Sequence, residues 1–251
     1  MKSFLFKACG AALAAACLGG VSGMLRAQQA PARPGASETR AQGESRAQSA
    51  EARVEALRSS DPLKRAAAAY ELSKRPAEAR AAIDVLLELL SDATVVDPGV
   101  YRRQDRMNSP YTNTTVGEEA AHALTVAGAE AVAPLIAALG RAEGEARRNA
   151  AWALGAIDDR RAVEPLTKTL GADADARVRE QAAWALGALG DRSASEAVAR
   201  ALADESAEVR QQAAWAAGAL GDRRAVERLV AALSDSAAGV REQAAWALGA
   251  V

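Results

Sequence analysis

The tryptophans of this chain recur at an almost constant interval, and no other feature constrains the fold as strongly. The successive spacings are 32, 31 and 31 residues, at Trp152, Trp184, Trp215 and Trp246. The string REQAAWALGA occurs twice without change, at residues 179–188 and 241–250, which lie two intervals apart. Self-similarity at a fixed period of roughly 20–50 residues is typical of a repeat array. The sequence therefore predicts stacked copies of one unit of about 31 residues.

Each copy contains two helical segments. In VREQAAWALGALGDRSASEAVARAL, apolar residues recur at helical spacing and predict a buried stripe of Val178, Ala182, Ala185, Leu186 and Leu189. An aspartate follows the turn in three copies, as Asp159, Asp191 and Asp222, where it can cap the second helix. Apolar content comes mainly from Ala and Leu with only 4% aromatic residues, which favours helix over strand. We expect an all-α fold, a solenoid of two-helix repeats.

Two further units precede these copies. EEAAHAL places His122 in the tryptophan position, and KRAAAAYEL places Tyr70 there. These two residues are 52 positions apart, so about 20 residues are inserted, at 94–115. The insert is polar and rich in turn residues, and it contains Tyr101, Arg102, Arg103 and Tyr111. A loop of this length is usually functional or disordered, and the repeat domain is expected to span residues 61–251.

The N-terminus resembles an export signal. Residues 1–27 combine lysines with an Ala- and Leu-rich apolar run and end in a small residue, which predicts a cleaved signal peptide. An uncleaved anchor is the alternative, as is a lipid anchor at Cys17, because Ala-Ala-Ala-Cys loosely resembles a lipobox. Both cysteines, Cys9 and Cys17, lie in this segment. We expect an exported bacterial protein of the periplasm or cell envelope, secreted or lipid-anchored, that meets a membrane only through this segment.

Residues 28–60 have the composition of a linker, rich in Ala, Gln, Ser, Glu, Arg and Pro. Its second half either forms a short helix with Val54 and Leu57 on one face or stays disordered. At the other end, the sequence stops at AWALGAV, where earlier copies continue into a turn and a second helix. We expect that a longer chain continues beyond Val251, or that another subunit covers this end.

The motif VRxxAAxALGxxGDxRAVxPL resembles the HEAT-like repeat of the phycobilisome-lyase type, over about residues 61–251. The resemblance implies a right-handed solenoid. It places the helix carrying VRxxAAxALG on the concave side and the helix carrying RAVxPL on the convex side. It also implies an arginine–aspartate ladder between repeats, formed here by Arg147, Arg179, Arg210 and Arg241 with Asp159, Asp191 and Asp222.

Similar repeats occur in enzymes, whose metal ligands occupy variable positions of the repeat. Deoxyhypusine hydroxylase binds two irons through His-Glu pairs in the two variable places after VR, whereas this chain has Arg148-Asn149, Glu180-Gln181, Gln211-Gln212 and Glu242-Gln243 there. A single histidine and no mature cysteine exclude the usual zinc sites. Phosphate-binding and nucleophile-elbow motifs are absent from the repeats. We assign no catalytic, cofactor-binding or metal-binding residue.

The remaining signal is an aromatic column flanked by polar positions. Tryptophan is enriched at binding hot spots, and a net charge of −1 does not suggest nucleic acid. We expect a non-enzymatic scaffold that binds a protein or peptide on its concave face. The candidate residues are Tyr70, His122, Trp152, Trp184, Trp215, Trp246, Glu180, Gln181, Gln211, Gln212, Glu242 and Gln243. The alternatives are indoles that only cover neighbouring side chains, a bilin-lyase-like or metal-dependent enzyme, and a regulatory module of a larger envelope protein.

Overall fold

The computed structural model describes residues 48–102 and 113–251. The predicted signal peptide with Cys17, the first half of the linker, and residues Arg103 and Tyr111 of the insert lie outside the described residues. The chain divides into two compact units, Met1–Gln42 and Gly43–Val251, and the description below concerns the second. No helix within the described residues is long and apolar enough to cross a membrane.

The second unit is built almost entirely of helices, as the sequence predicts. Residues 48–57 are helical, with Leu57 buried and Val54 packed on the core. The helices that follow are α2 (Pro62–Leu72), α3 (Pro76–Ala81), α4 (Ile83–Leu89), α5 (Val116–Ala127), α6 (Ala129–Ala138), α7 (Gly144–Ile157), α8 (Val163–Ala172), α9 (Ala176–Leu189), α10 (Ser195–Ala201), α11 (Ala207–Leu220), α12 (Val226–Ala232) and α13 (Ala238–Ala250).

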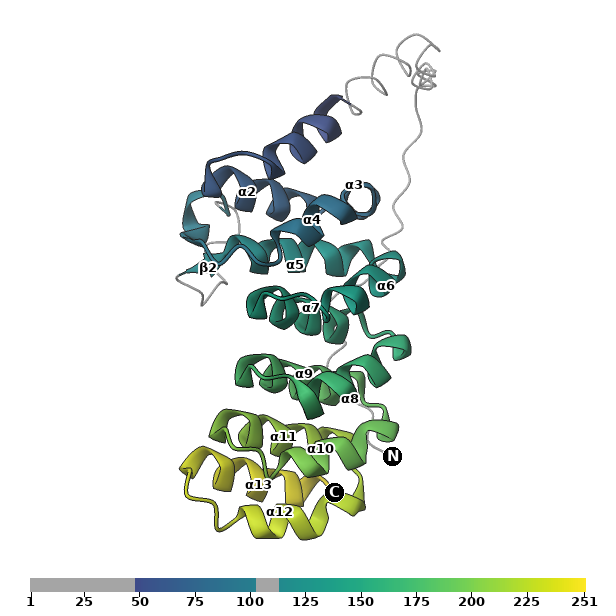
Figure 1. Cartoon of the computed structure of the whole chain (residues 1–251), viewed down its shortest axis with the longest axis vertical. Coiled ribbons are helices and arrows are strands. Elements are labelled where there is room, and N and C mark those ends of the chain that lie inside the picture. The colour runs from purple at the N-terminus through teal and green to yellow at the C-terminus, as the bar shows by residue number, and fades with distance from the viewer. Residues whose placement is uncertain (1–47, 103–112) are drawn as a thin grey trace, which may run out of the picture. The chain divides into compact units, whose positions relative to one another are not determined.

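The helices form two layers (Figure 1). The longer helices α5, α7, α9, α11 and α13 pack side by side in sequence order, with α2 next to α5. This layer carries the aromatic column, and we call it the tryptophan layer. The shorter helices α4, α6, α8, α10 and α12 each pack against the long helix that follows along the chain. The result is the α-solenoid predicted from the 31-residue period.

Local sequence explains where the helices begin and end. Asp175 and Ser206 accept hydrogen bonds from backbone N–H groups in the first turns of α9 and α11, which are otherwise without partners. Gly190 and Gly221 end these two helices with φ of 64° and 60°, a conformation that glycine adopts without strain. The capping aspartates Asp159, Asp191 and Asp222 then hold short 3-10 turns, η2 (Arg160–Ala162), η3 (Arg192–Ala194) and η4 (Arg223–Ala225), that lead into the second helices.

The core is a continuous seam of alanine, leucine and valine between the layers. In α9 the predicted stripe is buried at Val178, Ala182, Ala185 and Leu186, whereas Leu189 is partly exposed. Ala183 and Gly187, outside that stripe, are also buried. The buried arc is wider than periodicity predicts, because each long helix contacts long helices on both sides as well as the short-helix layer.

An arginine ladder joins successive repeats, but its aspartates are not those expected from the family resemblance. Arg179 extends from α9 to Asp204 in the loop before α11, with Nη2 2.8 Å from Oδ1. Its Nη1 donates to the carbonyl oxygens of Asp173 and Ala174 at 2.8 and 3.3 Å. The equivalent ion pairs are Arg65–Asp92, Arg147–Asp173 and Arg210–Asp235.

The prediction for Asp159, Asp191 and Asp222 was therefore wrong. Each of these carboxylates accepts from the backbone N–H two residues later and pairs with an exposed arginine of a 3-10 turn. Asp173, Asp204 and Asp235 of the ladder lie six residues before the next ladder arginine, and each also accepts from a backbone N–H in its loop. Arg241 donates to the carbonyl oxygens of Asp235 and Ser236 only, within the described residues.

The described ends of the insert are anchored to the first repeats. Strand β1 (Val95–Val96) pairs antiparallel with β2 (Thr114–Thr115), in the register Val95 with Thr115 and Val96 with Thr114. The 3-10 turn η1 (Pro98–Val100) follows β1. This small ribbon departs from a purely helical fold and brings both ends of the insert beside α5.

Candidate functional site

The predicted aromatic column exists as a row of rings along the tryptophan layer. His122 of α5 meets Trp152 of α7 edge-on, with ring centroids 4.4 Å apart. Trp152 and Trp184 of α9 lie nearly parallel, at 6.3 Å and 9° between planes. Trp215 and Trp246 continue the row on α11 and α13. At the other end, Tyr70 of α2 is buried.

Each indole of the last three repeats also packs across a glycine of the preceding helix. A Cβ atom added to Gly155 would lie 2.9 Å from Cζ3 of Trp184, and one added to Gly187 would lie 2.5 Å from Cζ3 of Trp215. The same relation joins Gly218 to Trp246 at 2.7 Å. Close helix approach therefore requires glycine here. The tryptophans hold neighbouring helices together as well as facing outward.

The indoles nevertheless keep solvent-accessible surface. Trp152, Trp184 and Trp215 are partly exposed while they pack on the core, and Trp246 is 51% exposed. Partial burial leaves an apolar edge available to a partner while the rest of the ring is fixed.

The polar columns beside the rings differ in exposure. Gln211 and Glu242 are exposed, and Glu180, Gln181, Gln212 and Gln243 are partly exposed. Asn149, in the same column as Gln181, is 4% exposed, and its Nδ2 donates to the carbonyl oxygen of Leu90 at 2.9 Å. The Asn149 side chain is therefore buried and not available to a partner, whereas the predicted glutamines and glutamates remain at the surface.

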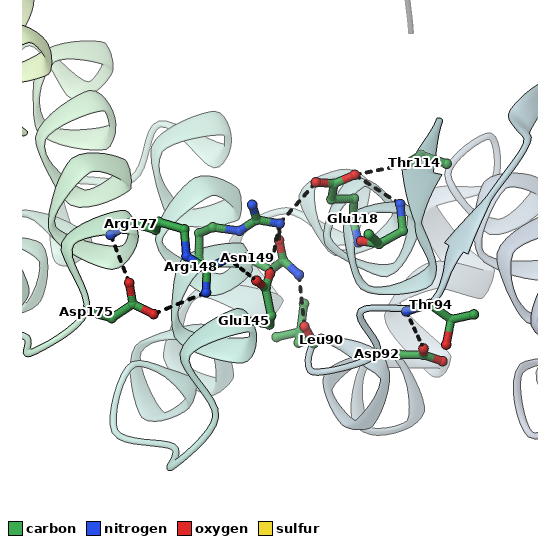
Figure 2. A network of polar contacts seen from close by, with 11 residues as sticks. Leu90, Asp92, Thr94, Thr114, Glu118, Glu145, Arg148, Asn149, Asp175 and Arg177 are labelled. Atoms are coloured by element: carbon green, nitrogen blue, oxygen red, sulfur yellow. Dashed lines mark hydrogen bonds and ion pairs between the residues drawn. The ribbon is translucent and has the colours of Figure 1, made fainter. Parts of the chain in front are cut away.

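A network of charges occupies the N-terminal half of this surface (Figure 2). Arg148 bridges Glu118 of α5 and Glu145 of its own helix, at 3.0 and 2.9 Å. Glu145 in turn pairs with Arg177 at 2.9 Å, and Arg177 lies 3.5 Å from Asp175. Glu118 also completes a capping box with Thr115. Both arginines of the network are therefore paired.

The C-terminal half of this surface is different, because its carboxylates Glu180, Glu208 and Glu242 are not paired with a described arginine or lysine. Among the described residues, no ion pair joins Glu180, Glu208 or Glu242 to an arginine or lysine, although Glu208 accepts from the hydroxyl of Ser206 at 2.7 Å. Partial burial and then the charge of Glu208 raise the pKa of Glu180, against an opposing effect of Arg148. The ionised form of Glu180 is thus incompletely stabilised by the protein itself.

The insert contacts the first position of the column. Tyr101 lies 5.7 Å from Tyr70 between ring centroids, and its hydroxyl donates to Oε1 of Glu119 at 2.8 Å. Arg102 forms an ion pair with the same oxygen. The Glu119 side chain is only 1% exposed, and burial raises its pKa although Arg102 opposes the change. Among the described residues, its Oε2 and the Nε of Arg102 have no hydrogen-bond partner.

The sequence does contain a signal for this contact. Glu119 stands in the column that holds Asn149, Gln181, Gln212 and Gln243 in later repeats. A carboxylate in a buried position needs a cation or hydrogen-bond donors. Tyr101 and Arg102 were identified as notable residues of the insert, but their meeting with Glu119 was not predicted.

His122 sits between these two regions. Partial desolvation, and then the positive charge of Arg102, lower the pKa of the imidazole, while Glu118 acts in the opposite direction. His122 is thus favoured as a neutral ring at neutral pH and packs as an aromatic residue against Trp152. The described residues contain no group of three or more His, Cys, Asp or Glu side chains placed to hold a metal ion.

The two helical layers and the repeated aromatic row define an α-solenoid. A model of HEAT repeats matches residues 111–187, 132–208 and 166–249, together more than half of the chain. The chain belongs to the HEAT-repeat proteins. No curated protein matches it.

Solved structures with low identity share the fold. The complex of CpcE and CpcF of phycocyanin lyase from Nostoc sp. PCC7120 is 23% identical with a TM-score of 0.54, over 66% of this chain and 98% of that chain. An engineered protein is 24% identical with a TM-score of 0.50, over 80% and 95% of the two chains. A structure of Kap95p bound to RanGDP is 15% identical with a TM-score of 0.55, over 78% of this chain but only 30% of that chain.

Proposed function

We propose that this protein is a non-enzymatic scaffold that binds a protein partner on the exposed surface of the tryptophan layer. The observation that carries the proposal is the row of partly exposed indoles, bordered by surface glutamates and glutamines on successive parallel helices. Such a surface offers repeated apolar and polar contacts at a fixed spacing, which suits an extended or helical segment. Two of the solved neighbours are complexes between proteins, which agrees with this use of the fold.

The surface around the rings allows a test that spares the packing. Ala188 and Ala219 are exposed, one helical turn after Trp184 and Trp215. Arginine at both positions adds bulk beside the rings and is compatible with helix ends. The matched control places arginine at Ala137 of α6 and Ala231 of α12, which are exposed in the short-helix layer.

The experiment compares the proteins that cross-link to wild type and to each double variant in cells of the source organism. The proposal expects one partner to be recovered with wild type and with A137R/A231R, and to be lost with A188R/A219R while helical circular dichroism is unchanged. Equal recovery with both double variants would place the binding surface elsewhere, and failure of wild type to recover any partner would also count against it.

The absence of catalysis and the exported location are parts of the same proposal. The location rests on residues 1–27, whose cleavage can be measured by N-terminal sequencing and cell fractionation. A stoichiometric metal or a bound chromophore in the purified protein would contradict the non-enzymatic assignment. The competing class is then a metal-dependent or bilin-attaching enzyme built on the same repeat.

A further inference from the structure

Cations already lie on the aromatic column at its N-terminal end. Nζ of Lys74 is 3.8 Å from the ring centroid of Tyr70, and Cζ of Arg102 is 5.0 Å from it. Arg102 also pairs with the buried carboxylate of Glu119. The first column position thus combines an aromatic ring, a carboxylate and a cation delivered by an insert.

The later column positions offer the ring and the carboxylate without the cation. Glu180 precedes Trp184 by four residues, and Glu242 precedes Trp246 by four, so each carboxylate lies one helical turn from its indole. No lysine or arginine among the described residues pairs with either carboxylate.

The charges beside the later rings point the same way. Glu180, Glu208 and Glu242 form no ion pair among the described residues, and Arg241 of α13 donates there only to backbone carbonyl oxygens. Arg148 and Arg177 are the cations of the network shown in Figure 2. Both cations are engaged by Glu118, Glu145 and Asp175, so the surplus negative charge lies toward α9, α11 and α13.

We infer that the tryptophan layer binds an extended protein segment that is rich in lysine or arginine. The inference rests on the proposed function and specifies the partner. A basic side chain lies against the indole of Trp184 or Trp246 and pairs with Glu180 or Glu242 of the same helix. Arg102 makes a related pair of contacts with the ring of Tyr70 and with Glu119 of the next helix. Trp152 and Trp215 have Arg148 and Gln211 in the corresponding place, so the basic side chains are recognised at Trp184 and Trp246.

The inference is tested with defined peptides and the full chain. Three fluorescent peptides of about twelve residues alternate serine with arginine, glutamine or glutamate, and binding is followed by fluorescence anisotropy. We expect the arginine peptide to bind, its affinity to fall with salt, and the glutamine peptide to bind at least about tenfold more weakly. No binding of the arginine peptide, or equal binding of the glutamine peptide, would overturn the inference.

A charge-matched pair of variants separates recognition from bulk electrostatics. E180Q/E242Q removes two carboxylates beside the rings, and E164Q/E227Q removes two exposed carboxylates of α8 and α12. E180Q/E242Q should weaken the binding of the arginine peptide by about three- to tenfold. E164Q/E227Q should weaken it by less than about twofold. Equal weakening would show that only net charge matters and would refute the inference.

The cross-linking experiment keeps the two proposals distinguishable. If A188R/A219R abolishes partner recovery and the arginine peptide does not bind, the binding surface stands and the basic segment is wrong. If the partner is recovered equally by both arginine double variants and the peptide does not bind, both proposals fail.

Discussion

Gly187 and Gly249 hold the same position in two identical ten-residue strings, yet the structure gives them different surroundings. A Cβ atom on Gly187 would lie 2.5 Å from Cζ3 of Trp215 and 2.9 Å from Cα of Ala216. A Cβ atom on Gly249 meets nothing within 4 Å. Since carbon atoms pack favourably at about 3.5–4.0 Å, G187A should destabilise the protein and G249A should not.

The magnitude follows from two opposing effects. Replacing a helical glycine by alanine stabilises the helix by about 0.5–1 kcal/mol. Overpacking a filled interface costs about 1–3 kcal/mol, and the upper part of that range applies here because the contacts include the backbone of Ala216 and a rigid indole. G187A should therefore lower the free energy of unfolding by about 1–2 kcal/mol. G249A, next to a helix end, should change it by less than about 0.5 kcal/mol.

Urea unfolding of both variants, followed by far-ultraviolet circular dichroism, measures the difference. A double-mutant cycle with Trp215→Leu supplies a second readout, because the shorter side chain removes the closest contact. The cost of G187A should be smaller in that background. If G187A proves as stable as G249A, or if its cost is the same with leucine at position 215, the proposed packing of indole on glycine is refuted.

Three further predictions concern polar contacts. Arg179→Ala removes the cation from the carboxylate of Asp204, which is 12% exposed, and should cost about 3 kcal/mol. Arg241→Ala, at an exposed position, should cost less than about 1 kcal/mol in the same urea assay; equal costs would contradict the ladder. Tyr101→Phe removes a donor to the buried Glu119 and should cost about 1.5–3 kcal/mol, with faster hydrogen exchange over residues 94–102; unchanged exchange would contradict the contact. The hydrogen bond from Arg210 holds the pKa of Asp235 at about 2, below an unfolded value of about 3.9. The ionised Asp235 therefore stabilises the folded state fully above about pH 4, and this stabilisation is lost as pH falls toward 2. Asp235→Asn should reduce the dependence of the free energy of unfolding on pH between about 2 and 4. An unaltered slope would contradict the assignment.

The fold was predictable because its information is local and repeated. The 31-residue period, the glycine–aspartate turn and the alanine–leucine stripe all lie within one unit, and each copy confirms the others. The stripe in α9 was predicted apart from Leu189. Periodicity of one helix shows which side is apolar, but the extra burial of Ala183 and Gly187 depends on how closely the next helix approaches.

The aspartate partners of the ladder arginines could not be predicted from the local sequence of one repeat. Asp159 and Asp173 both follow helices in loops and both precede backbone N–H groups that they can cap. Only the stacking of repeats shows that Asp173 lies beside Arg147, 26 residues before it in sequence. The insert poses the same difficulty, because the meeting of Tyr101 with Glu119 depends on the path of a loop that has no counterpart in other repeats.

The packing of indole on glycine changes what the repeated tryptophan means for binding. Since Trp184, Trp215 and Trp246 fill the space above Gly155, Gly187 and Gly218, stacking alone is sufficient reason for a tryptophan in each of the last three repeats. The same is not true of Glu180 and Glu242, which make no hydrogen bond or ion pair among the described residues and whose place is taken by glutamine in the repeat between them. These carboxylates beside the rings therefore specify the kind of partner, while the partly exposed indoles provide the surface on which it binds.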